Sequence, residues 1–68
     1  TQTLEVEDNI ILLNKNVTGT PTLDAGLEVE RGSGDNTKLY FEESSDSWKI
    51  TVGSTTKTIA FVEDQYSS

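Results

Sequence analysis

The side chains in this chain that could do chemistry are of few kinds. The 68 residues contain no His and no Cys, so imidazole or thiolate catalysis, metal sites built on those groups, and disulfides are all excluded. What remains is 12 Asp and Glu against 5 Lys and Arg, together with hydroxyl groups that include two Tyr. Any active site would therefore have to use carboxylates, hydroxyls or amines.

Paired carboxylates are the strongest catalytic arrangement that these residue types allow, because two of them at a suitable separation can hydrolyse a glycosidic bond. Glu5 and Glu7 form one such pair and Glu28 and Glu30 another. Both pairs alternate with Leu or Val, which places the carboxylates on the solvent face of a strand. A domain of this size also lacks the volume for a cleft of a few hundred Å³. We therefore expect that the chain is not an enzyme.

A divalent-cation site is the second arrangement that the carboxylates permit. Asp35, Asn36, Glu43 and Asp46 lie in turn sequences and offer the oxygen ligands that Ca²⁺ takes. The spacing of an EF-hand is missing, and Asp and Asn are common in turns for backbone reasons alone. Three symmetry-related carboxylates on a trimer axis could converge on an ion, but within one chain we expect no metal and no cofactor.

Two aromatic residues could bind a ligand by stacking, since aromatic rings suit the apolar faces of sugars. Trp48 is in register with Ile50 and Val52, which indicates a core position. Tyr40 lies on the opposite face of its strand. Tyr40 is therefore the expected contact for a receptor, if the chain binds one.

The formal net charge of -7 limits the classes of partner that the chain could bind. Phosphate contacts from Lys and Arg dominate nucleic-acid binding, and anionic membranes also attract basic segments, so neither partner fits this chain. No run approaches the roughly 20 apolar residues of a membrane span. The carboxylates are scattered along the sequence, which is typical of a solvated surface.

The elements that must position these residues are short strands. Alternation predicts strands at Thr3–Glu7, at 26–30, at Lys38–Glu42, at 48–52 and at Thr56–Val62, and four consecutive apolar residues predict another at 10–13. The pattern closest to a hairpin joins 38–42 to 48–52 through a polar turn at 43–46. We expect an all-β fold, namely a small antiparallel sheet or sandwich-like module of five to six short strands.

A shortage of apolar residues suggests that further copies of the chain complete this fold. The hydrophobic fraction is 32%, and a lone domain of this length buries only about 60% of the surface that its unfolded chain exposes. The consecutive apolar residues need cover on both faces of their strand. We therefore expect interchain contacts at Ile10, Ile11, Leu12 and Leu13; the alternative is an ordinary central strand of the chain's own core.

The stretch from Asp24 to Val52 carries a resemblance to a known family. It contains AGLEVERG at 25–32, then Asn36, Leu39, Phe41 and Glu42, then Asp46, Trp48, Ile50 and Thr51. This order resembles a module of the tail fibres and related appendages of tailed bacteriophages, including contractile-tailed phages of marine cyanobacteria. The segment at 8–22 also matches what precedes the module, so the resemblance covers roughly two thirds of the chain.

The chain departs from the family pattern at two places. Phe41 stands where the family often has Trp, and the sequence after Thr51 reads VGSTTKTIAF rather than the commoner NDG. The second departure bears on how the module joins whatever follows it. We expect a single β-module over 1–68, a piece of a longer fibre protein, with N-terminal strands and a loop at 1–23, the core hairpin region at 24–52 and a last strand and tail at 53–68.

The resemblance implies a function as well as a fold. Fibres of this family are generally trimeric and belong to the host-attachment apparatus of the virion, where the module would contact itself and adjoining fibre segments. A shaft module is the first expectation, a receptor-binding tip that recognises a host-surface glycan or protein is the alternative, and a monomeric interaction domain is a third option. We also expect Arg31 to pair with a carboxylate of its own or a neighbouring chain, because its fork of donors suits bidentate contacts.

Overall fold

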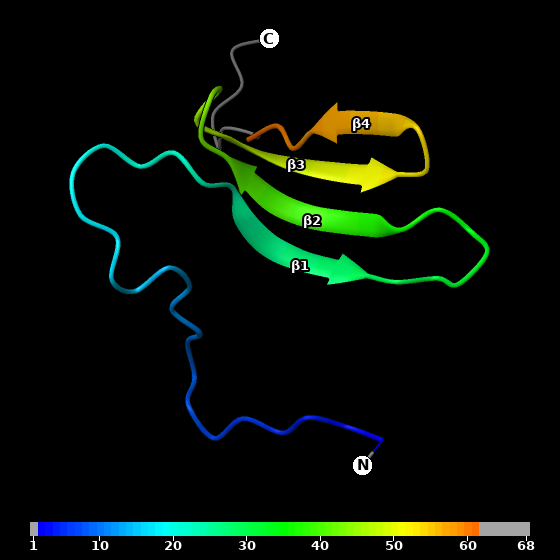
Figure 1. The fold of residues 1–68 in the computed structure, drawn as a ribbon, viewed down its shortest axis with the longest axis horizontal. Coiled ribbons are helices and arrows are strands. Elements are labelled where there is room, and N and C mark those ends of the chain that lie inside the picture. The colour runs from blue at the N-terminus through cyan, green and yellow to red at the C-terminus, as the bar shows by residue number, and fades with distance from the viewer. Residues whose placement is uncertain (1, 62–68) are drawn as a thin grey trace, which may run out of the picture.

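A computed structural model describes residues 2–61, and its one regular element is an antiparallel sheet (Figure 1). The sheet contains β1 (Ala25–Val29), β2 (Thr37–Glu42), β3 (Ser47–Val52) and β4 (Thr55–Thr58), in the order β1-β2-β3-β4. Each strand therefore pairs with its neighbour in sequence, and no helix occurs among the described residues. The predicted all-β class is confirmed.

The predicted hairpin at 38–52 is confirmed in β2 and β3. Phe41 lies opposite Trp48 and Leu39 opposite Ile50. The turn at 43–46 ends on Asp46 with a φ of 52°, a left-handed conformation that Asp tolerates better than most residues. Alternating apolar residues on both strands fix this register, because a slip by one residue would move every apolar side chain to the other face.

The connection from β3 to β4 is a two-residue turn at Gly53 and Ser54. Gly53 has a φ of 61° and Ser54 has no positive φ, the pattern of a type II′ turn, which suits the twist of paired strands. β4 is shorter than the strand predicted at 56–62. It ends at Thr58, although the backbone N–H of Ile59 still donates to the carbonyl of Trp48 at 2.8 Å. Val62 lies outside the described residues.

The strands predicted at Thr3–Glu7 and at 10–13 need correction, because the structure contains no strand in either segment; residues 2–61 form four strands rather than five to six. The physical reason is that a β-strand needs a neighbouring strand to pair its backbone N–H and C=O groups, in addition to an alternating sequence pattern. Alternation predicts which side chains would be half-buried, but here no described strand of the same chain pairs with these segments.

The sheet has one apolar and one polar face, and no second layer formed by residues 2–61 covers either. We call the side formed by alternate positions the apolar face; its members are Ala25, Leu27, Val29, Leu39, Phe41, Trp48, Ile50, Val52 and Ile59. No described residue is buried, and Leu27 on this face is 66% exposed. The sandwich-like packing expected from the sequence is thus not formed by one chain.

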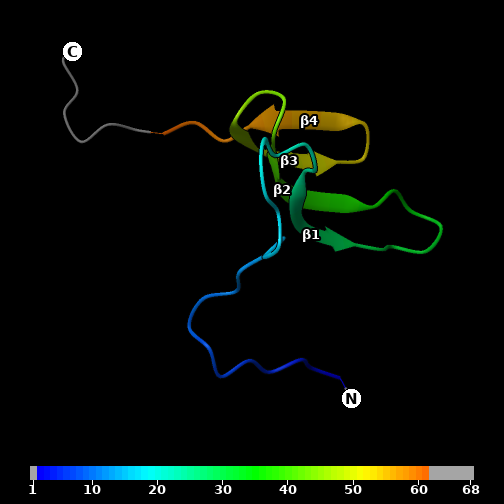
Figure 2. The ribbon, with the colours of Figure 1, turned by 60° about the vertical axis from the view of Figure 1, so that its left-hand side comes forward.

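The chain as a whole is far more extended than a compact domain. It exposes 6453 Å² of accessible surface, whereas a compact monomer of its mass would expose about 4,200 Å². Its radius of gyration is 15.5 Å, against about 11 Å for a compact domain of this length. In both views, the N-terminal segment lies beyond the β1 edge of the sheet (Figures 1 and 2).

Candidate functional site

The apolar face combines side chains from all four strands of the sheet. Three cross-strand rows can be traced over the four strands: Ala25, Phe41, Trp48 and Ile59; Leu27, Leu39, Ile50 and Lys57; Val29, Thr37, Val52 and Thr55. The rings of Phe41 and Trp48 meet edge to face, with their centroids 5.6 Å apart at 72°. Such aromatic and branched cross-strand pairs stabilise a sheet, yet Trp48 remains 42% exposed.

A hollow of about 250 Å³ lies on this face over β1, β2 and β3. Its lining residues are Leu27, Val29, Thr37, Lys38, Leu39 and Ile50. Because aliphatic side chains dominate the lining, the hollow suits an aliphatic side chain from elsewhere better than a polar ligand.

Polar side chains on the opposite, polar face form hydrogen bonds and an ion pair with one another. Lys49 Nζ donates to Thr58 Oγ1 at 2.7 Å and lies 3.9 Å from Glu42 Oε1. The hydroxyls of Thr51 and Thr56 share a hydrogen bond of 3.0 Å. Each such contact between partly exposed groups contributes little to stability, typically under about 1 kcal/mol for an ion pair. This face can therefore remain in water, while the apolar face gains from being covered.

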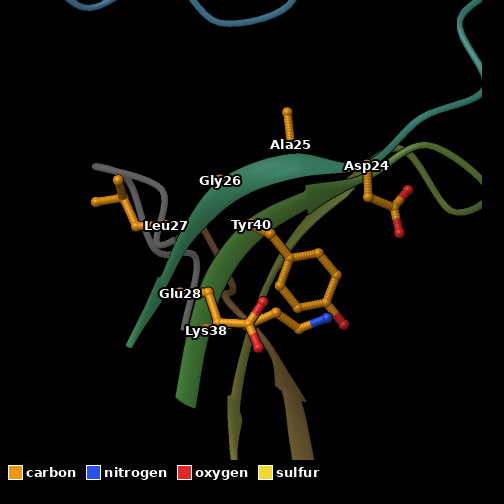
Figure 3. A pocket seen from close by; sticks show the side chains of 7 residues that line it. All are labelled: Asp24, Ala25, Gly26, Leu27, Glu28, Lys38 and Tyr40. Atoms are coloured by element: carbon orange, nitrogen blue, oxygen red, sulfur yellow. The ribbon is translucent and has the colours of Figure 1, made fainter. Parts of the chain in front are cut away.

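Tyr40 lies on the polar face as predicted, at a hollow of about 240 Å³ beside β1 (Figure 3). Asp24, Glu28 and Lys38 also line it, and Lys38 Nζ is 4.6 Å from the centre of the Tyr40 ring. Tyr40 is half-buried, so in the single chain it is less available than the sequence suggested. Conversely Trp48, predicted as a core residue, is exposed.

Gly26 is the residue at this hollow that the sequence analysis missed. It lies directly opposite Tyr40 in the β1–β2 ladder. A Cβ on Gly26 would clash with the carbonyl oxygen of Leu39 and come within 2.6 Å of Tyr40 Cβ. The signal was present, since a Gly beside an alternating strand pattern marks a close backbone approach.

Arg31 forms its hydrogen bonds within the loop between β1 and β2. The guanidinium Nη1 of Arg31 donates to the backbone carbonyl of Asp35 at 3.3 Å, and the backbone N–H of Arg31 donates to Asn36 Oδ1 at 3.2 Å. Asn36 Nδ2 in turn donates to Glu28 Oε2 at 2.9 Å. Among the described residues Arg31 braces its own loop and forms no ion pair with a carboxylate. Pairing with a neighbouring chain stays a prediction.

The turn carboxylates are not gathered into a metal-binding group. Within residues 2–61 no three Asp or Glu side chains are placed to hold an ion. Asp24 Oδ1 instead accepts the backbone N–H of Glu43 at 2.9 Å, which ties the start of β1 to the turn between β2 and β3. Asp35 and Asn36 serve the loop described above. Their position in turns therefore has a backbone explanation.

The four apolar residues expected at a chain interface, Ile10, Ile11, Leu12 and Leu13, are all exposed in the single chain, Ile10 by 74% and Leu12 by 72%. A second, open hollow of about 400 Å³ begins at Leu13 and has a mixed lining: Leu13, Val17, Pro21, Leu23 and Ala25, together with Asn14, three Thr residues and Glu43. The structure thus leaves two apolar surfaces uncovered, this segment and the apolar face.

In the described part of the chain there is no helix of the length and hydrophobicity needed to cross a membrane. Comparison with protein-family models, curated proteins and solved structures gives no match for this chain.

Proposed function

We propose that the chain is a structural β-module of a phage tail fibre or similar virion appendage, and that it assembles as a homotrimer through its apolar face. The observation that carries the proposal is the uncovered apolar face. The chain as a whole exposes 6453 Å² of accessible surface, which exceeds the roughly 4,200 Å² of a compact monomer by more than the area of about 800 Å² that each partner buries in a standard interface. Assembly with further copies would remove this excess.

The family resemblance supports the same conclusion residue by residue. Its motif falls on β1, the following loop, β2 and β3, which together carry most of the apolar face. Seven of the motif residues lie on that face: Ala25, Leu27, Val29, Leu39, Phe41, Trp48 and Ile50. A surface that a shared motif builds but one chain leaves bare is typical of a subunit contact. In this proposal the module belongs to the outside of the virion and adjoins other fibre segments.

The test compares two neighbouring residues of β3 that point to opposite faces. Ile50→Lys places a charge in the middle of the apolar face, where burial of an unpaired charge is very unfavourable. Thr51→Lys places the same charge on the polar face. Sedimentation should give a trimer for the parent chain and for Thr51→Lys, and a lower mass for Ile50→Lys. Equal masses for all three would contradict assembly through the apolar face.

A receptor-binding tip is the second candidate, and the hollow at Tyr40 favours it. The Tyr40 ring can stack on a sugar. The nearby carboxylates can accept hydrogen bonds from the sugar hydroxyls, and the ammonium group of Lys38 can donate to them. The test is binding to a glycan array, with Tyr40→Ala as the variant and Thr58→Ala, also on the polar face, as the control. A tip predicts binding that only Tyr40→Ala abolishes. Absence of binding by the parent chain would remove this candidate.

A further inference from the structure

The N-terminal segment, residues 2–13, leaves its apolar side chains exposed, although Leu13 at its end shares a hollow with Val17 and Ala25. Leu4, Val6 and the four residues at 10–13 are all exposed. The segment has no strand partner and no backbone hydrogen bond to the sheet. Ordering such a segment costs conformational entropy that only new contacts can offset.

The linker at 14–24 directs this segment away from its own apolar face. Asp24 anchors one end of the linker to the turn at Glu43. At the other end Asn14 adopts a φ of 55°, and its carbonyl accepts the N–H of Val17 at 3.1 Å. The segment consequently runs beyond β1 rather than over the sheet, in both views (Figures 1 and 2). Eleven linker residues can span up to about 36 Å, so the segment can reach a neighbouring molecule.

The charges of the segment fit the apolar face better than the polar face. Residues 2–13 contain Glu5, Glu7 and Asp8 and no basic residue. The cross-strand rows of the apolar face include one charged residue, Lys57, and no acid. The polar face carries Glu28 and Glu42 together with Lys38 and Lys49, so its charges balance, whereas Lys57 is an unopposed positive charge on the apolar face.

We propose, on the basis of the assembly proposed above, that residues 10–13 of one copy pack on the apolar face of a second copy. Alternate residues of the segment would enter the hollow lined by Leu27, Leu39 and Ile50, while the acidic residues before them approach Lys57. Each chain then gives its segment to one neighbour and receives another on its sheet. The exchange covers both uncovered surfaces with one contact, and it makes the sheet of every subunit dependent on the next.

Cysteine cross-linking tests this exchange directly, because the chain has no Cys of its own. Leu12→Cys is combined with Ile50→Cys in one full-length chain, and the protein is oxidised gently and run on a non-reducing gel. The matched control combines Leu12→Cys with Thr51→Cys, whose position is adjacent but on the polar face. We expect the first variant to shift from single-chain to multi-chain mass and the control to stay mainly at single-chain mass.

Light scattering on the same samples separates this inference from the proposed function. A disulfide within a single chain would show that the segment folds back on its own sheet, and would overturn the exchange. A trimer that forms no disulfide specific to Leu12→Cys with Ile50→Cys would also overturn the exchange but leave the trimer intact. A monomeric mass before oxidation would contradict both.

Discussion

At the scale of single residues, the sheet depends on one position without a side chain and on one aromatic pair. Gly26 allows β1 to approach β2 beside Tyr40, where any Cβ would overlap backbone atoms. Phe41 and Trp48 hold the adjoining hairpin together across β2 and β3. None of these three residues is buried in the single chain. Each therefore shapes the sheet without belonging to a buried core.

Gly26→Ala should destabilise the protein, because the new methyl group has no space between Leu39 and Tyr40. Overpacking of this kind typically costs about 1–3 kcal/mol. The matched control is Gly34→Ala, since the nearest atom to a Cβ there is Arg31 Nη1 at 3.4 Å. Thermal unfolding followed by circular dichroism at one chain concentration should show a clear loss for Gly26→Ala alone. Equal melting temperatures would contradict the close approach of β1 and β2.

At the scale of elements, the two hairpins that share β3 form from local signals. Turn residues at 43–46 and at Gly53 connect strands whose apolar residues match across the ladder. The first strand is joined by a longer loop, and one side-chain contact, from Glu43 N–H to Asp24 Oδ1, closes the end where β1 begins. That contact also holds the end of the linker at 14–24 that adjoins the sheet.

Asp24→Ala should therefore loosen β1 more than β3 or β4. Loss of one hydrogen bond at a partly exposed site costs about 0.5–1.5 kcal/mol. Asp24→Asn keeps a carbonyl acceptor in the same place and should retain most of the stability. Amide hydrogen exchange would measure this, with faster exchange expected in β1 and unchanged exchange in the β3–β4 turn for the Ala variant. Uniformly faster exchange across the sheet would argue against a local tie.

The sequence predicted the elements that depend on near neighbours and failed for those that depend on distant partners. The hairpin that joins 38–42 to 48–52 was predicted from alternation and turn residues alone, whereas its register of Leu39 with Ile50 and Phe41 with Trp48 comes from the structure. The segment at Thr3–Glu7 alternates just as well, yet it forms no strand, because alternation does not supply a pairing edge. The exposure of Trp48 could not be predicted either, since an apolar face indicates burial without saying which chain provides it.

At the scale of the whole molecule, the chain has the surface of an incomplete fold. Its accessible area and radius of gyration both exceed those of a compact domain of 68 residues. Its polar face is hydrogen-bonded, while its apolar face and its apolar N-terminal segment are exposed, as the proposed assembly requires. In the proposed fibre module, further copies of the chain would cover these exposed apolar surfaces.

Trp48, the only Trp of the chain, lies on the apolar face. Its fluorescence therefore reports whether that face becomes buried on assembly. Assembly should transfer its indole from water to an apolar contact. Its emission should therefore shift to shorter wavelength, and acrylamide should quench it less, in the assembled state than after dissociation by dilution or in Ile50→Lys. If mass changed on dilution while emission and quenching stayed constant, the interface would have to lie elsewhere on the molecule.

The proposed trimer is tested by the absolute mass of the parent chain in solution, measured by sedimentation or light scattering over a wide range of concentrations. We expect about three times the chain mass of 7.5 kDa, held on dilution until the sheet signal in circular dichroism is lost together with the trimer. A folded monomer of 7.5 kDa that keeps its sheet and its melting transition at every concentration would contradict it.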